Sequence, residues 1–176
     1  IRVGKSDYFV TEACEYTNSF LSFFPRISII LNIEEDHLDF FKDINDIRNS
    51  FHRFAKNTSP DGVLIINSAM DRPEEITADL KERVVTFGLT GTENYTAADI
   101  TYNDKGCASF TFLCNGEKSG YISLNVPGKH NISNALAAIA FAMEAGFNRD
   151  FIIRGLAAHG AMPHLGQDAV MAMAHL

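Results

Sequence analysis

The chain has 176 residues, of which 46% are hydrophobic and 21% are charged, and this composition is typical of a globular protein of one domain. Its 15 basic and 22 acidic residues give a net charge of −7. Such an acidic balance argues against nonspecific binding to nucleic acid or to an anionic membrane, because neutralising phosphate groups needs an excess of lysine and arginine. The sequence shows neither a long apolar span nor the plan of a signal peptide, and we expect a cytoplasmic protein.

The first half of the chain alternates predicted strands with predicted helices. Apolar residues recur every three or four positions between residues 43 and 56, which predicts a helix with Asp43 as its N-cap. A second predicted helix runs from Pro73 to about Lys81. Four apolar segments are predicted strands: residues 7–11, 27–33, 63–66 and 84–87. This alternation favours an α/β fold with a mainly parallel sheet flanked by helices.

A different pattern follows between residues 94 and 126. Asn115-Gly116 and the segment 103–106 are typical of hairpin turns. These turns separate three predicted strands: residues 98–102, 109–113 and 121–126. We therefore expect a small antiparallel side sheet that is attached to the α/β core.

Two predicted helices and an irregular tail complete the chain. Residues 131–145 are apolar on every side, which predicts a buried helix that ends at Gly146, and residues 148–156 predict a last helix. The tail of residues 159–176 carries three methionines and three histidines without a clear period. We expect either a poorly ordered end or a short helix from Gln167 onward.

Carboxylates follow the first two predicted strands, where parallel sheets bind their ligands. Glu12-Ala13-Cys14-Glu15 comes after the first strand, and residues 32–39 come after the second. The second segment packs four carboxylates beside His37, and such carboxylates repel one another unless a cation neutralises them. Mg²⁺ prefers oxygen ligands, whereas an added imidazole is more usual for Mn²⁺ or Zn²⁺. The alternative is a pair of solvated loops in which these side chains only cap turns or helices.

A third segment, residues 127–135, places a glycine turn, His130 and two asparagines at the start of the buried helix. Asn131 and Asn134 are three residues apart and therefore lie near each other on its first turn. A carboxamide offers a donor and an acceptor side by side, which matches the edge of adenine. The alternative is that Asn131 is only the N-cap of the helix.

Together these segments resemble the central, ATP-binding domain of the Mur ligases. In that family an E-A-[DC]-E segment is followed by S-F-L and by a strand that ends in N-[IV]-E-x-D-H-x-D, which here are residues 12–15, 19–21 and 32–39. Residues 127–138 match the family segment P-G-x-H-N-x-x-N-A-x-A-A. The resemblance predicts a partial, P-loop-type Mur ligase central domain over residues 1–158 and a divergent or disordered tail over residues 159–176.

The resemblance also implies roles for individual residues. Glu12 and His37 would bind divalent cations, Mg²⁺ or Mn²⁺, and His130, Asn131 and Asn134 would face the adenine and ribose of ATP. The implied reaction is ATP-driven amide formation, in which a carboxylate takes the γ-phosphoryl group and the resulting acyl phosphate is attacked by an amine. In the branch of the family with the most similar motifs, the substrates are UDP-N-acetylmuramate and L-alanine, and the product serves peptidoglycan synthesis.

A Mur ligase also needs a glycine-rich loop ending in Gly-Lys-Thr, whose N–H groups and lysine hold the phosphates. Gly4-Lys5-Ser6 does not qualify, because it lacks the upstream glycine and precedes a strand. The resemblance places the loop before residue 1, and no arginine pair follows Gly155-Leu156 where the family has one. We therefore expect the chain alone to be inactive, to bind ATP very weakly, and to self-associate through an uncovered sheet edge or face.

Several hypotheses stay open from the sequence. The first is a piece of the ligase that joins L-alanine to UDP-N-acetylmuramate. A related ligase, which adds a peptide or glutamate, would have the same kind of central domain. The second is a stand-alone module that binds a nucleotide or a metal without catalysis. The third is a purely structural remnant.

Overall fold

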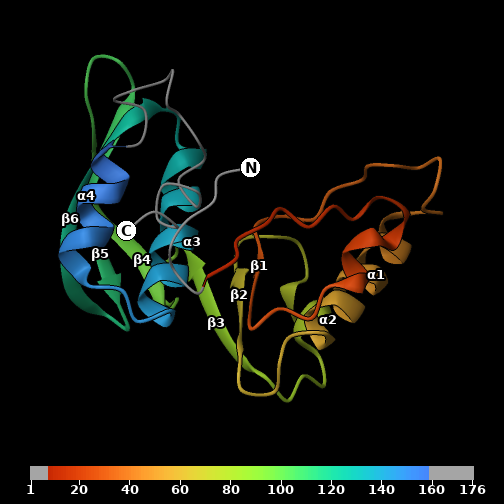
Figure 1. Ribbon diagram of the computed structural model, residues 1–176. Coiled ribbons are helices and arrows are strands. Elements are labelled where there is room, and N and C mark those ends of the chain that lie inside the picture. Colours follow the sequence, from red (N-terminus) through yellow and green to blue (C-terminus); the bar gives the residue numbers. More distant parts are fainter. Residues whose placement is uncertain (1–7, 159–176) are drawn as a thin grey trace. The chain divides into compact units, whose positions relative to one another are not determined.

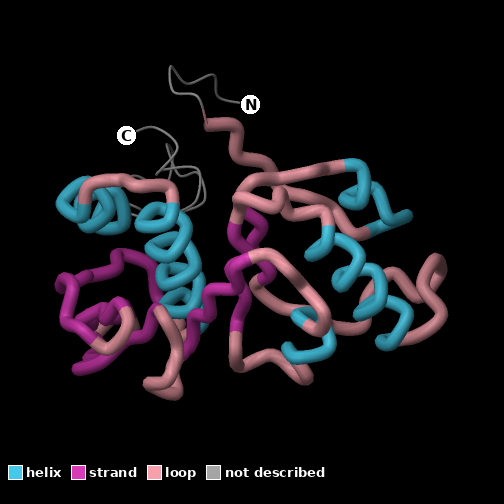
Figure 2. Tube along the Cα trace, turned by 90° about the horizontal axis from the view of Figure 1, so that it is seen from below, coloured by secondary structure: helices cyan, strands magenta, loops and turns pink. Residues whose placement is uncertain are grey.

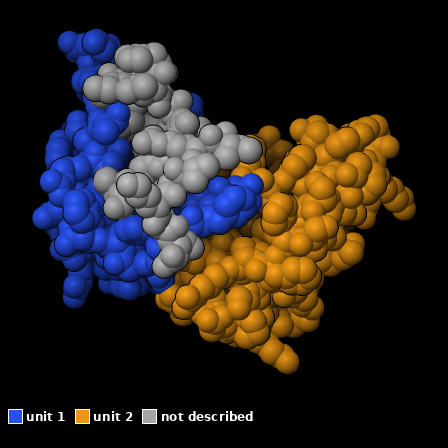
Figure 3. All heavy atoms as spheres, in the orientation of Figure 1, with its two compact units in different colours: residues 1–11, 87–176 blue, residues 12–86 orange. Residues whose placement is uncertain are grey.

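The computed structural model describes residues 8–158 and divides the chain into two compact units (Figures 1 and 3). One unit comprises residues 12–86, and the other comprises residues 87 onward with the segment that precedes residue 12. The predictions for residues 1–7 and for the tail of residues 159–176 lie outside the described residues.

The unit of residues 12–86 is built on parallel strands with helices against them. Strands β1 and β2 pair in parallel, from Ile27 beside Val63 to Ile30 beside Ile66. Its elements are the 3-10 helix η1 (Tyr16–Ser22), β1 (Ile27–Ile30), α1 (Ile44–Lys56), β2 (Val63–Asn67), α2 (Pro73–Thr77) and the start of β3 (Arg83–Gly88). Val63 to Ile66 are all buried, as expected of the central strand of this unit.

Helix α1 begins where the sequence predicts, because the side chain of Asp43 accepts hydrogen bonds from the backbone N–H groups of Asn45 at 2.9 Å and Asp46 at 3.0 Å. Its apolar face packs on η1. The ring of Phe20 stacks on that of Phe54 at 4.8 Å between centroids. The segment that carries Glu15 is therefore anchored directly to α1.

The described residues of the other unit form the antiparallel strands and two helices. Its strands are β4 (Tyr95–Tyr102), β5 (Cys107–Cys114) and β6 (Glu117–Pro127), and its helices are α3 (His130–Glu144) and α4 (Arg149–Ala158). β4, β5 and β6 pair antiparallel, and the Asn115-Gly116 turn has φ of 49° and 82°, as a two-residue hairpin turn requires. Both helices lie against one face of these strands (Figures 1 and 2).

The sheet order is β1-β2-β3-β4-β5-β6. Strand β4 pairs in parallel with β3, through Phe87 beside Tyr95 and Gly88 beside Thr96. The predicted antiparallel strands are thus confirmed. None of the helices in residues 8–158 has the length and apolarity that a membrane span requires.

Helix α3 is buried on nearly every side, as its sequence predicts. It ends in a Schellman motif: the N–H of Gly146 donates to Met143 and the N–H of Phe147 donates to Ala142, with Gly146 at a φ of 81°. The hydroxyl of Tyr95 donates to the carboxylate of Glu144 at 3.0 Å. Burial, followed by the charge of Glu144, raises the pKa of Tyr95 well above its usual value.

Three predicted elements differ from the structure. The part of the first predicted strand that the structure describes, residues 8–11, is not a strand, and Phe9 in it is 85% exposed. The strand predicted to reach Ile33 ends at Ile30. The helix predicted to reach Lys81 ends at Thr77, because Ala78 is extended and Asp79 takes a left-handed conformation in which its carboxylate meets Lys56 at 2.9 Å. At the end of α2, this tertiary contact overrides local propensity.

We predict that Gly62→Ala lowers the free energy of unfolding by about 3 kcal/mol or more, as severe overpacking does. A Cβ atom at Gly62 would lie 2.1 Å from the backbone oxygen of Arg26, and neither backbone can yield without disturbing the start of β1 or β2. Urea denaturation measures the loss. The control is Gly146→Ala, where a Cβ meets no neighbour and only the positive φ opposes it, at a cost of about 1 kcal/mol. Equal losses in the two variants would contradict the close backbone approach.

Candidate functional site

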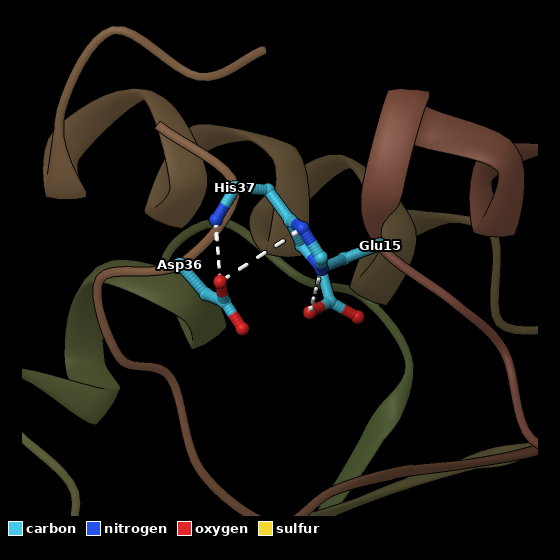
Figure 4. A group of neighbouring side chains, drawn as sticks. All are labelled: Glu15, Asp36 and His37. Atoms are coloured by element: carbon cyan, nitrogen blue, oxygen red, sulfur yellow. Dashed lines mark hydrogen bonds and ion pairs between the residues drawn. The ribbon is translucent and has the colours of Figure 1, made fainter. Parts of the chain in front are cut away.

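The segment after β1 and the segment before η1 meet in a group of three side chains. Glu15, Asp36 and His37 each place one possible metal-ligand atom within 4.8 Å of those of the other two. Nε2 of His37 is 3.6 Å from a carboxylate oxygen of Glu15, and Nδ1 is 3.8 Å from one of Asp36 (Figure 4). The segments that carry Glu15 and His37 therefore meet within one compact unit.

The backbone at His37 takes the left-handed conformation, with a φ of 52°. This conformation costs a residue with a side chain roughly 1–2 kcal/mol. Hydrogen bonds on both sides hold it: the N–H of His37 donates to the carboxylate of Asp36 at 2.7 Å, and its carbonyl accepts from the N–H groups of Phe40 and Phe41. Strained backbone that its surroundings enforce is common at functional sites.

Tyr16 joins the two segments from the other side of the imidazole. Its ring lies 4.6 Å from the ring of His37 between centroids, and its hydroxyl donates to the carboxylate of Asp39 at 2.8 Å. That hydrogen bond, with the negative charge of Asp39, raises the pKa of Tyr16 above its usual value.

A cavity of about 210 Å³ opens beside the group. Its polar wall consists of Glu15, Asn32, Glu34 and Asp36, and its apolar wall consists of Ile33, Phe41, Ile47 and Phe51. The polar wall carries three carboxylates, which makes this hollow attractive to a cation and to the groups that a cation brings with it.

The donor set fits a hard divalent cation. Two carboxylates supply oxygen ligands, which Mg²⁺ and Mn²⁺ prefer, and the imidazole supplies a nitrogen that suits Mn²⁺ better than Mg²⁺. The side chains of Glu15 and His37 are each 32% exposed and that of Asp36 is 73% exposed, so a cation here would keep positions open for water or phosphate oxygens. This is the coordination that phosphate-handling sites use.

Glu12, which the resemblance assigns to the cation, is exposed and does not belong to the group of three. Its role stays a prediction. Sequence reasoning named the motifs that hold Glu15 and Asp36 but did not select these residues as ligands. The signal was present in their positions, since Glu15 directly precedes η1 and Asp36 adjoins His37.

The predicted nucleotide contacts lie in the other compact unit, at the start of α3. Asn131 is in the first turn and is not the N-cap, which is Lys129. Its side-chain amide donates to the carbonyl of Pro127 at 2.8 Å, and its carbonyl oxygen accepts from Asn134 at 3.5 Å. The imidazole of His130 packs on Gly128, where a Cβ would be 2.7 Å from the ring. The structure therefore gathers His130, Asn131 and Asn134 on one exposed helix end.

Comparison with known proteins places the chain in a family. The family model of the Mur ligase middle domain matches residues 2–142. The chain belongs to this family. A UDP-N-acetylmuramate–L-alanine ligase of Agathobacter rectalis is 54% identical over 156 residues, which cover 89% of this chain and 34% of that protein. The ligase of the same name from Lachnospira eligens is 51% identical over 88% of this chain and 34% of its own length.

Solved Mur ligase structures share the fold. The ligase MurF of Acinetobacter baumannii matches 81% of this chain with a TM-score of 0.67 and 29% identity, over 30% of its own length. The UDP-N-acetylmuramate–alanine ligase MurC of Thermotoga maritima matches 79% of this chain with a TM-score of 0.64 and 28% identity, over 30% of its own length. The Mur ligase middle domain thus spans about a third of the length of the relatives that it matches.

A titration with Mn²⁺ separates the two candidate carboxylates of this Mur ligase domain. We predict that Glu15→Gln weakens Mn²⁺ binding by about ten-fold or more, since even changes around metal ligands commonly reduce affinity 10- to 100-fold. Isothermal titration calorimetry or the electron paramagnetic resonance of free Mn²⁺ measures it. Glu35→Gln is the matched control, because it removes one charge from the same acidic loop outside the group of three. Weakening by Glu12→Gln alone would instead support the assignment that the resemblance gives.

Proposed function

We propose that the chain supplies the middle domain of an ATP-dependent ligase that joins L-alanine to UDP-N-acetylmuramate in peptidoglycan precursor synthesis. The observation that carries this proposal is the identity of 54% with a ligase of that name over 156 residues. The relatives from Lachnospira eligens and Clostridium perfringens, at 51% and 46% identity, carry the same name, and this agreement favours L-alanine over the other substrates of the family. Because the chain spans about a third of these relatives, the activity is proposed for the protein to which this domain contributes.

In the proposed reaction, a carboxylate oxygen of the sugar attacks the γ-phosphorus of ATP and ADP leaves. The amine of L-alanine then attacks the acyl phosphate, an amide bond forms, and inorganic phosphate and a proton are released. A divalent cation, when bound, offsets the negative charge on the phosphoryl oxygens. Glu15, Asp36 and His37 would hold that cation, and the cavity beside them leaves room for its remaining ligands.

The residues at the start of α3 would hold the nucleotide. The hydrogen bond from Asn131 to Pro127 fixes the orientation of that carboxamide, and Asn134 beside it presents a second one. Paired donors and acceptors of this kind match the edge of an adenine ring. Helix α3 is buried along its length, so these side chains are presented on a rigid element.

We also propose a cytoplasmic location and no binding to nucleic acid or membrane. The acidic balance, with a net charge of −7, supports the lack of such binding. The free thiols of Cys14, Cys107 and Cys114 support a reducing compartment.

A domain replacement tests the proposed function. Residues 2–142 of this chain replace the matching segment of the Agathobacter rectalis ligase, and phosphate release is measured with ATP, UDP-N-acetylmuramate and L-alanine. We expect phosphate release that requires all three substrates and that falls at least about 100-fold in His37→Ala, since a metal ligand is lost. Glu35→Gln should leave it near the unsubstituted level. A folded replacement protein that releases no phosphate with L-alanine would refute the proposal.

We also predict that the chain self-associates through the exposed edge of its sheet. Within the described sheet, β1 is an edge strand, and the apolar side chains of Phe24 and Leu31 on either side of it are exposed. Such edges pair with other chains. We expect light scattering to show dimers or larger species that Leu31→Lys reduces. Leu38→Lys, which adds the same charge at an exposed leucine away from the strand, should not. A monodisperse monomer at all concentrations would contradict this expectation.

A further inference from the structure

Tyr16 makes two contacts to the segment that carries His37. Its ring lies 4.6 Å from the imidazole with an angle of 36° between the planes, and its hydroxyl donates to Asp39 at 2.8 Å. Tyr16 directly follows Glu15, so the same backbone that offers a carboxylate to the candidate metal centre also offers this ring. One residue thus ties the segment before η1 to the segment after β1.

The distances show why the imidazole needs such a contact. Its nitrogens are 3.6 Å from Glu15 and 3.8 Å from Asp36, which is beyond the 2.7–3.2 Å range, roughly, of a hydrogen bond. Neither carboxylate therefore fixes the ring by a hydrogen bond. The backbone bonds of His37 fix its Cα, but they leave rotation of the side chain open. The ring of Tyr16, tilted by 36° and 4.6 Å away between centroids, contacts the imidazole itself and restrains it.

We propose that Tyr16 is a positioning residue for His37: it packs on the face of the imidazole and holds Asp39, so that the ring nitrogens stay turned toward Glu15 and Asp36. This inference rests on the proposed function for its purpose, which is to preorganise a divalent-cation site. Packing on the ring face leaves the in-plane lone pairs free, and these are the orbitals that a cation uses. Tyr16 itself supplies no ligand atom to the group of three.

Two variants distinguish the effect of the ring contact from that of the hydrogen bond. Tyr16→Phe keeps the ring against His37 and removes the hydrogen bond to Asp39, whereas Tyr16→Leu removes both. If the ring does the positioning, the phenylalanine variant retains most of the effect. Tyr102→Leu is the matched control, since Tyr102 is another half-exposed tyrosine, on β4 in the other compact unit.

The first measurement needs no metal. In the 176-residue chain, the ring protons of His37 should show nuclear Overhauser effects to the ring of Tyr16 and a ring-current shift, since the centroids are 4.6 Å apart. We expect both to persist in Tyr16→Phe and Tyr102→Leu, and the shift to vanish in Tyr16→Leu. Absence of the Overhauser effects in the unsubstituted chain overturns the proposal without any variant, so it stays testable if Tyr16→Leu does not fold.

The second measurement is Mn²⁺ affinity, followed by the paramagnetic broadening of the His37 ring signals. We expect Tyr16→Leu to weaken binding by about ten-fold, in the range of changes to residues that orient metal ligands, and Tyr16→Phe by about two- to three-fold. Unchanged Mn²⁺ affinity in a folded Tyr16→Leu variant overturns the positioning role. Equal binding by the unsubstituted chain and His37→Ala instead overturns the metal site of the proposed function, and the ring signals still decide whether Tyr16 holds His37.

Discussion

Strand β1 has four residues, and its parallel pairing with the buried strand β2 fixes the point at which the following segment leaves the sheet. Asn67 at the end of β2 strengthens this point, because its side-chain amide donates to the carbonyl of Leu31 at 3.0 Å. The residues from Asn32 to Asp39 therefore start from a fixed position. The positions of Asp36 and His37 in the candidate metal centre depend on that constraint, since these two residues have no regular element of their own.

In the candidate metal centre, repulsion between carboxylates is opposed by the contacts that hold the side chains in place. Glu15 and Asp36 bring two negative charges to the same imidazole, and Glu34 lines the adjoining cavity. Carboxylates that gather in this way are stabilised by a cation and destabilised without one. The backbone hydrogen bonds of His37 and the aromatic contact of Tyr16 hold the geometry against that repulsion. The three side chains are thus already gathered without a cation.

Helix α3 is held in place by burial, not by contacts between loops. Its alanine-rich sequence lets it pack on all sides, its end is closed at Gly146, and Tyr95 binds its last residue. The nucleotide residues proposed at its start are therefore carried by an element that the core of the unit fixes. The candidate metal centre relies on contacts between loops, whereas the proposed nucleotide contacts rely on one rigid helix.

The sequence by itself determined the class of fold, most element positions and the family. Unbroken apolar runs marked β2 and α3, Asp43 and Gly146 marked helix ends, and Asn115-Gly116 marked a hairpin, because each depends on local backbone chemistry. The pairing of β4 with the end of β3, the early ends of β1 and α2, and the choice of Glu15 beside His37 were decided only by the tertiary structure. Strand order and side-chain convergence depend on contacts between residues far apart in the chain. The sequence pattern alone does not show which distant segments of the chain contact each other.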